Sequence, residues 1–161
     1  MTTDPPIRLA DPHDASTIAR MSRDLIEPGL PWTWRPDRVL RSIRATEVNV
    51  AVVGEGVDLA GFGIMEYLED DAYLALFAVR EASRRLGIGS ALLRWLQASA
   101  AAAGARRIRL DTRRDNIAAR SFYNEHGYHE LEIRRGRYGG SVDGIRLEKW
   151  LRARPEPATP A

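Results

Sequence analysis

The stretch AYLALFAVREASRRLGIGS, residues 72–90, decides the fold. Its first eight residues are apolar and rich in strand-forming side chains, so they predict a buried strand over Tyr73–Val79. A basic segment follows, and GIGS (residues 87–90) then opens a helix whose apolar residues recur at i, i+3, i+4 and i+7. The pattern therefore predicts a strand, a glycine turn and a helix in direct succession.

The glycine turn suits an anion. The first N–H groups of a helix have no partner inside the helix and lie at the positive end of its dipole, and glycine allows close approach of a phosphate. Arg80, Arg84 and Arg85 add positive charge beside the turn. The alternative is an ordinary strand–helix turn with solvated arginines. Neither a P-loop nor a dinucleotide fingerprint is present, because the chain's one lysine is Lys149 and Leu92 replaces the third small residue.

The residues downstream narrow the interpretation. A second strand, Arg107–Asp111, leads to Asp115-Asn116 and then to a short helix ending in FYNEHGY, residues 122–128. This order resembles the GNAT superfamily of acyl-CoA-dependent N-acetyltransferases, and loosely its ribosomal-protein N-terminal alanine acetyltransferase subgroup. The resemblance is close over the second half of the chain and is a matter of pattern in the first half.

The resemblance implies a site for acetyl-CoA as co-substrate. The family's Arg/Gln-x-x-Gly-x-Gly/Ala motif, which holds the pyrophosphate, corresponds to Arg84, Gly87 and Gly89. Asn116 would contact the pantetheine arm, and backbone groups at Phe77, where an oxyanion donor is also implied, and at the end of that strand would pair with the arm. The expected cofactor-binding residues are Phe77, Ala78, Val79, Arg84, Arg85, Leu86, Gly87, Ile88, Gly89, Ser90, Asn116, Ala119 and Tyr123.

Acetyl transfer to an amine has three requirements: a neutral amine, donors for the oxyanion, and a proton for a thiolate whose pKa is about 8.5. The resemblance implies that Tyr123 is the acid. Asp111 stands where the subgroup has its glutamate base, although it is equally readable as a strand-end carboxylate paired with Arg109 or Arg113. Glu66 is a second candidate base, and a water chain is a third possibility.

The acceptor side is less defined. Trp32 and Trp34, in a proline-rich loop over residues 27–36, and Tyr138, in a glycine-rich loop over residues 136–140, are the predicted substrate-binding residues. The two tryptophans form either a clamp over the acceptor or, slightly favoured, a hydrophobic plug over the sheet. A peptide N-terminus, a small amine, an antibiotic and an amino acid all remain open as acceptors.

Composition bounds the alternatives. The 161 residues contain no cysteine, so disulfides, thiolate metal sites and cysteine nucleophiles are excluded, and 24 Lys+Arg against 22 Asp+Glu leave a formal charge of +2. Arginine-rich zones at Arg80–Arg85 and Arg106–Arg120 allow a nucleic-acid-binding module as an alternative, and a non-catalytic acyl-CoA sensor is another. We expect no metal, because His126 and His129 lack a further ligand at suitable spacing. We also expect no membrane contact and a cytoplasmic location, and a homodimer stays open.

The expected element order is β-α-α-β-β-β-α-β-α-β-β, an α/β (α+β) fold with a mixed central sheet of about seven strands and helices on both faces. Residues 1–151 are expected to form a single domain, and residues 152–161 a disordered, proline-rich tail. The expected helices and strands occupy residues 7–10, 11–26, 37–45, 48–53, 59–67, 73–79, 88–103, 107–111, 117–127, 128–135 and 144–151.

Overall fold

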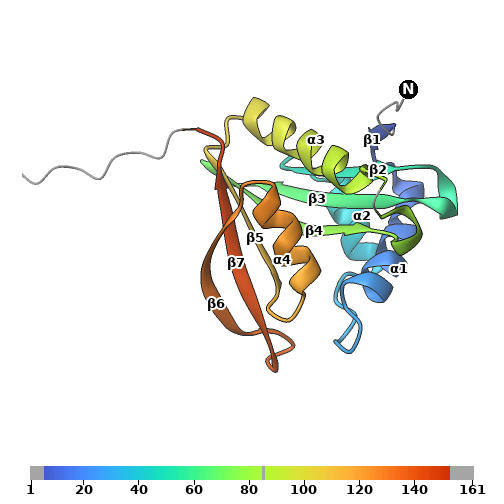
Figure 1. The fold of residues 1–161 in the computed structure, drawn as a ribbon. Coiled ribbons are helices and arrows are strands. Elements are labelled where there is room, and N and C mark those ends of the chain that lie inside the picture. The colour runs from blue at the N-terminus through green and yellow to red at the C-terminus, as the bar shows by residue number, and fades with distance from the viewer. Residues whose placement is uncertain (1–5, 85, 153–161) are drawn as a thin grey trace, which may run out of the picture.

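One mixed sheet of seven strands forms the centre of the molecule in this computed structural model, which describes residues 6–84 and 86–152 (Figure 1). The strands lie in the order β1-β2-β3-β4-β5-β7-β6, and among them β4 and β5 are the parallel neighbours. Their bounds are β1 Ile7–Leu9, β2 Val48–Val53, β3 Gly61–Tyr67, β4 Asp71–Val79, β5 Arg107–Arg113, β6 His129–Tyr138 and β7 Val142–Trp150.

Helices cover both faces of the sheet, as Figure 1 shows. On one face, α1 (Ala15–Leu25) and α2 (Pro36–Arg44) pack on β2, β3 and β4 around the buried residues Ile18, Val39 and Phe62. On the other face, α3 (Ile88–Ala102) and α4 (Ile117–Glu125) enclose a second core with side chains of β4, β5 and β7. The predicted mixed sheet and the element order are confirmed.

Helix α3 follows directly from its sequence pattern. Leu92, Leu93 and Leu96 are fully buried on the sheet, and Ala100 continues the same face one turn later. Gly104 ends the helix in a left-handed conformation with φ 91°. The helix therefore lies along the sheet with its N-terminal turn at the end of β4.

The most important feature of the sheet is a divergence between β4 and β5. The two strands pair from Asp71↔Arg107 to Leu74↔Leu110, and the pairing then stops although both strands continue. On its other side β4 shifts register against β3 beyond Leu74, so Ala75 forms a β-bulge. Because a bulge bends the strand that carries it, the second half of β4 leaves β5 and opens a gap in the sheet.

One expectation about local structure was wrong. The glycine-rich segment 136–140 is not a loop throughout, since β6 continues to Tyr138 and the turn follows it. An irregularity in the β6–β7 register and a hydrogen bond from the Gly136 N–H to the Asp143 carboxylate accommodate the extra residues. The first helix begins with a 3-10 turn, Pro12–Asp14, capped by Asp11 and Asp14.

The expected tail lies almost wholly outside the described residues. Within the part of the chain that the structure describes, no helix has the length and apolar character needed to cross a membrane.

Candidate functional site

The gap between β4 and β5 exposes backbone hydrogen-bonding groups. The Arg80 N–H donates to the Ala60 carbonyl on the β3 side of β4. Because bonding direction alternates along a strand, Ala78 faces β3 as well, and the N–H and C=O groups of Phe77 and Val79 face the gap. Among the described residues Phe77 and Val79 therefore have no strand partner on this side, although the Val79 carbonyl accepts from a side chain, Arg84 Nε.

At the end of this edge lies the turn that begins α3. Gly87 is the N-cap in a left-handed conformation with φ 77°, and a Cβ built there would meet no atom within 4 Å. The N–H groups of Ile88, Gly89 and Ser90 are in the first turn, where a helix provides no acceptor. The turn is open to solvent, with Leu86 69% exposed. Amides and helix dipole thus converge on one accessible point.

The three arginines expected beside the turn differ in position. Arg84 is exposed and donates through Nε to the Val79 carbonyl at 3.2 Å, which keeps its side chain against the end of β4. Arg80 instead turns toward the β2–β3 connection, where its Nε donates to Leu59 at 2.6 Å and Nη2 to Val57 at 3.3 Å. The expectation that Arg80 lies free beside the anion was therefore wrong. Arg85 lies outside the described residues.

Helix α4 contacts this turn through His126, a residue for which the sequence indicated no role. Nδ1 of His126 lies 2.8 Å from the Phe122 carbonyl oxygen and donates to it, so in the neutral ring Nε2 accepts from the Ser90 hydroxyl at 3.0 Å. Asn116 caps the other end of α4, with its side-chain oxygen accepting from the Ala119 N–H at 3.1 Å. Asn116 is exposed and its amide nitrogen stays available.

Tyr123 lies on α4, facing the core beneath the gap. Its ring packs edge-to-face with Phe77, Phe122 and Tyr128 at centroid distances of 6.2, 5.3 and 5.6 Å. The ring is 6% exposed, and among the described residues its hydroxyl has no hydrogen-bond partner. Burial, with a smaller contribution from Tyr138, raises the pKa of Tyr123 well above its ordinary value. The hydroxyl is therefore protonated throughout the neutral range and can act as a donor.

Asp111 is held more tightly than the sequence suggested. Its Oδ1 accepts from Arg146 Nε at 2.9 Å, and its Oδ2 accepts from Arg146 Nη2, Arg137 Nε and the Tyr73 hydroxyl at 3.1, 3.1 and 2.9 Å. Burial alone raises the pKa of the Asp111 carboxyl, but these hydrogen bonds outweigh it and the net pKa is lowered. Four accepted bonds and a lowered pKa leave little basicity.

The partners of Asp111 also differ from the expected ones. Arg146 stands directly opposite Asp111 in the antiparallel β5–β7 register, whereas Arg109 is bound to Glu148 and Arg113 to Asp115. No feature of the local sequence around Asp111 indicates this pairing, because the two residues are far apart in the chain.

Glu66, the second candidate base, is positioned differently. It lies on β3 opposite Tyr73 and is half-buried. Within the described residues its carboxylate has no hydrogen-bond or ion-pair partner. Its oxygens are thus available to accept a proton.

The α1–α2 loop packs against the core formed by these two helices. Trp34 is buried in the α1–α2 core, and Trp32 packs against that core while its Nε1 donates to the Ala19 carbonyl at 3.1 Å. This packing corresponds to the hydrophobic plug over the sheet, rather than to a clamp over the acceptor. The buried Glu27 carboxylate holds the loop by accepting from Ser22 and from the Thr33 N–H and hydroxyl. Contact of Trp32, Trp34 or Tyr138 with an acceptor stays a prediction.

The basic zone over residues 106–120 is largely neutralised by neighbouring carboxylates. The ion pairs are Arg107–Asp71, Arg107–Glu148, Arg109–Glu148, Arg113–Asp115, Arg114–Asp143 and Arg120–Glu130. A nucleic-acid surface needs free positive charge that can replace counterions at phosphates. These pairs weaken the nucleic-acid-binding alternative.

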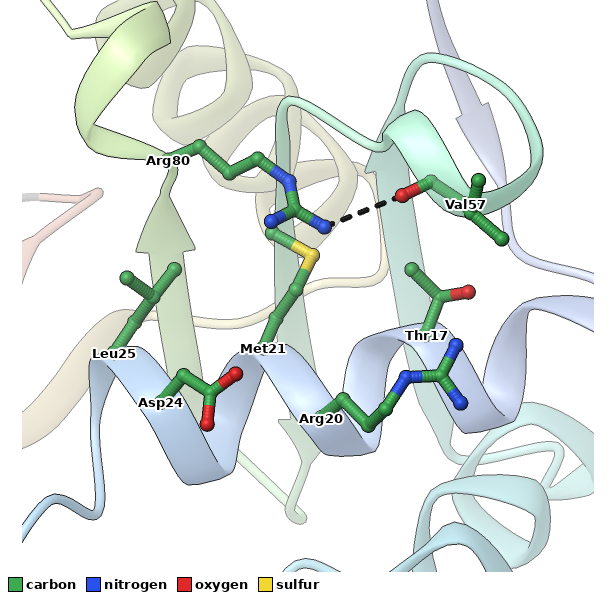
Figure 2. Close-up of a pocket in the computed structure, with 7 residues that line it drawn as sticks. All are labelled: Thr17, Arg20, Met21, Asp24, Leu25, Val57 and Arg80. Carbon is green, nitrogen blue, oxygen red and sulfur yellow. Dashed lines mark hydrogen bonds between the residues drawn. The ribbon is translucent and has the colours of Figure 1, made fainter.

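A separate cavity of ≈ 250 Å³ lies between α1 and the β2–β3 connection (Figure 2). Thr17, Met21 and Arg80 are among its lining residues, and none of the lining residues comes from β5, α4, β6 or β7. It is therefore distinct from the β4–β5 gap. In the part of the chain that the structure describes, no three His, Cys, Asp or Glu side chains group as a metal site would require.

Solved structures with the same fold include several acetyltransferases. Ard1 from Thermoplasma volcanium aligns with a TM-score of 0.78 and 24% identity, over 92% of this chain and 98% of that chain. The ribosomal-protein-S18-alanine N-acetyltransferase from Escherichia coli aligns with a TM-score of 0.76 and 24% identity, over 96% and 98%. PaiA N-acetyltransferase from Thermoplasma acidophilum in complex with coenzyme A aligns with a TM-score of 0.73 and 17% identity, over 92% and 99%.

A search among curated protein sequences found no match. A family model does match: residues 19–128, more than half of the chain, fit the acetyltransferase (GNAT) family. This range contains the diverging strands β4 and β5, the glycine turn and Tyr123, which together form the candidate site. The chain therefore belongs to the GNAT family of acetyltransferases.

Proposed function

We propose that the protein transfers an acetyl group from acetyl-CoA to a primary amine, by direct attack of the amine within a ternary complex. The single observation that carries the proposal is the β4–β5 gap, whose free edge at Phe77 and Val79 leads into the open glycine turn of α3. An extended arm with amide groups fits the strand edge, and a diphosphate fits the turn. Coenzyme A has both parts in this order.

Acetyl-CoA would supply the acetyl group and a thiol as leaving group. The amides at the start of α3 would hold its diphosphate, with Arg84 close by and Ser90 oriented by His126. Outward-facing N–H groups of β4 would bind the arm and the carbonyl oxygen on which negative charge develops. The protonated Tyr123 hydroxyl would donate to the sulfur as it leaves.

For the base, we propose Glu66 in preference to Asp111. Glu66 has free oxygens near Tyr73, whereas every oxygen of Asp111 already accepts from an arginine or a tyrosine. Asp111 then has a positioning role: it orients Arg146, Arg137 and Tyr73 at the acceptor side of the gap. An α-amine with a pKa near 8 needs little assistance, so a carboxylate acting through water suffices.

The test is calorimetric titration with acetyl-CoA, followed by a thiol-release assay across amino acids, short peptides and polyamines. We expect saturable binding and acceptor-dependent thiol release. Absence of binding would overturn the proposal. Binding without release across the whole panel would favour the non-catalytic acyl-CoA sensor.

A further inference from the structure

Four side chains from four strands meet on the sheet face opposite α3 and α4. Leu110 and Leu147 lie in the α3–α4 core, so Asp111 and Arg146, the next residue of β5 and the preceding residue of β7, face the other way. Tyr73 of β4 and Arg137 of β6 complete the group through their bonds to Asp111. We call these four residues the arginine cluster. The α1–α2 core takes its strand residues from β2, β3 and β4, so helices do not cover β5 to β7 here.

The arginine cluster has more positive charge than it neutralises. Its single carboxylate, Asp111, is 1% exposed, while Arg146 and Arg137 are 21% and 40% exposed. Arg146 binds through Nε and Nη2, and Arg137 through Nε and Nη2. In the described residues both Nη1 groups lack a partner. Glu132, opposite Arg146 in the β6–β7 register, offsets part of the remaining positive charge, although it also pairs with Arg134. Two sets of free donors therefore reach the solvent side.

A carboxylate on the other side of β4, that of Glu66, completes the arrangement. Glu66 lies across from Tyr73 on β3, so the negative charge is on the β3 side of the gap and the excess positive charge on the β5–β7 side. Adjacent strands are about 4.8 Å apart, and Asp111 lies two residues beyond Arg109, the β5 residue opposite Tyr73, so the Glu66 and Asp111 backbones are roughly 12 Å apart. Long side chains from both sides can reach one small molecule between them. Such a site matches a molecule with an amine at one end and an anion at the other.

We propose that the acceptor carries a carboxylate close to its amine, and that Arg137 and Arg146 bind this carboxylate while the amine faces Glu66. Guanidinium groups bind carboxylates through paired, charge-assisted hydrogen bonds. The fixed charge of the cluster disfavours polyamines and aminoglycosides, which would bring a second positive charge next to it. A free amino acid and a peptide with an acidic residue near its N-terminus share this chemistry. This inference rests on the proposed acetyl transfer.

The experiment compares acceptors that differ in one charge. Alanine is paired with alaninamide, an Ala-Asp dipeptide amide with its Ala-Asn equivalent, and spermidine serves as a polycation. We expect kcat/KM to favour the carboxylate member of at least one pair by about 10-fold or more, since a hydrogen bond to a charged group contributes about that factor. The favoured pair distinguishes a free amino acid from an acidic peptide.

Arg137→Gln tests the assignment, and Arg134→Gln is its matched control. Both arginines are on β6 with side chains 40% and 39% exposed, but Arg134 binds Glu132. Arg137→Gln should raise KM about 10-fold for the carboxylate acceptor and leave the neutral one within 2-fold, with acetyl-CoA affinity unchanged. Arg134→Gln should change neither, and Arg137→Lys should recover part of the preference.

Equal use of charged and neutral acceptors, preference for spermidine, or an equal loss for both acceptors in Arg137→Gln would overturn the inference. In each of these cases acetyl-CoA still binds and thiol is still released. Failure of the proposed function differs, because the wild-type protein would then either bind no acetyl-CoA or release no thiol with any acceptor.

Discussion

Tyr123 and Asp111 are both withdrawn from water, yet they acquire opposite chemical characters. Tyr123 is surrounded by aromatic rings without a hydrogen-bond partner in the described residues, so burial keeps it neutral and protonated. Asp111 is surrounded by donors, so it stays ionised despite its burial. The neighbours of a buried group, rather than burial itself, decide whether it donates a proton or anchors a positive charge.

Tyr123→Phe should lower kcat about 100-fold or more while changing the Kd of acetyl-CoA less than about 3-fold. The ring and its packing remain, and the lost hydroxyl is the proposed proton donor. Steady-state kinetics and calorimetric titration measure the two quantities.

Tyr128→Phe is the control for this change. It removes a hydroxyl in the same aromatic group, one that donates to Gln97 at 2.9 Å away from the gap, and should leave kcat nearly unchanged. Equal kcat in Tyr123→Phe and the wild type would remove Tyr123 from the acid role.

Asp111→Asn should lower the free energy of unfolding at pH 7 by roughly 2–3 kcal/mol. Breaking a fully buried pair costs about 3–5 kcal/mol, and here both arginines reach water, which reduces the cost. Because the folded pKa of Asp111 is lowered, its stabilising effect is fully present above the unfolded pKa of about 3.9 and is lost as pH falls through the folded value.

Urea unfolding at pH 7 and pH 3 therefore measures how much the ionised Asp111 carboxylate contributes to the free energy of unfolding, and in which direction this contribution changes with pH. The difference between wild type and Asp111→Asn should narrow at the lower pH. A difference that grows on acidification would contradict the assignment of Asp111 as an ionised anchor.

Among the structural elements, α3 connects the fold to the proposed site through its first turn. The same helix carries a positive-φ glycine at each end, Gly87 at 77° and Gly104 at 91°, and a Cβ on either would meet no atom within 4 Å. Alanine at either position therefore introduces the same backbone strain, about 1 kcal/mol. The two positions differ in their relation to the proposed site, because Gly87 adjoins the proposed diphosphate site and Gly104 lies at the opposite end of the helix.

Gly87→Ala should weaken acetyl-CoA binding about 10-fold or more, because its Cβ projects into the open space before the first amides of α3. Gly104→Ala should lower the melting temperature by about as much as Gly87→Ala does, and it should leave the affinity for acetyl-CoA unchanged. Titration calorimetry and thermal unfolding of both variants give the comparison. Equal affinities in the two variants would place the diphosphate elsewhere.

For the whole molecule, the gap means that ligand binding completes the sheet. Amides of Phe77 and Val79 have no strand partner on the β5 side, so we expect them to exchange with solvent faster than amides of β2, which pairs on both edges. Acetyl-CoA should slow exchange at Phe77, Val79 and the first turn of α3, and leave β2 unchanged. Hydrogen-exchange mass spectrometry measures this pattern.

Binding of acetyl-CoA should also raise the free energy of unfolding, by about 2.7 kcal/mol when acetyl-CoA is at 100 times its Kd. Protection confined to the cavity lined by Thr17, Met21 and Arg80 would show that the ligand binds at the other site.

Several features of this protein follow from local sequence. The apolar run before Val79, the glycines at 87 and 89 and the periodic leucines of α3 each act within a few residues, so the strand, the glycine turn and the helix were predictable from local sequence. Asn116 as a helix cap is equally local. These signals depend on backbone conformation and side-chain spacing, which neighbouring residues determine.

Other features required the tertiary structure. Asp111 binds Arg146 and Arg137 because the β5–β7 and β6–β7 registers bring together residues that are distant in the chain. The β4–β5 gap depends on a bulge at Ala75, and the orientation of Arg80 depends on carbonyls of the β2–β3 connection. Strand register and the partners of a charged side chain are long-range choices among many chemically similar residues, and in an arginine-rich chain only the folded sheet selects between them.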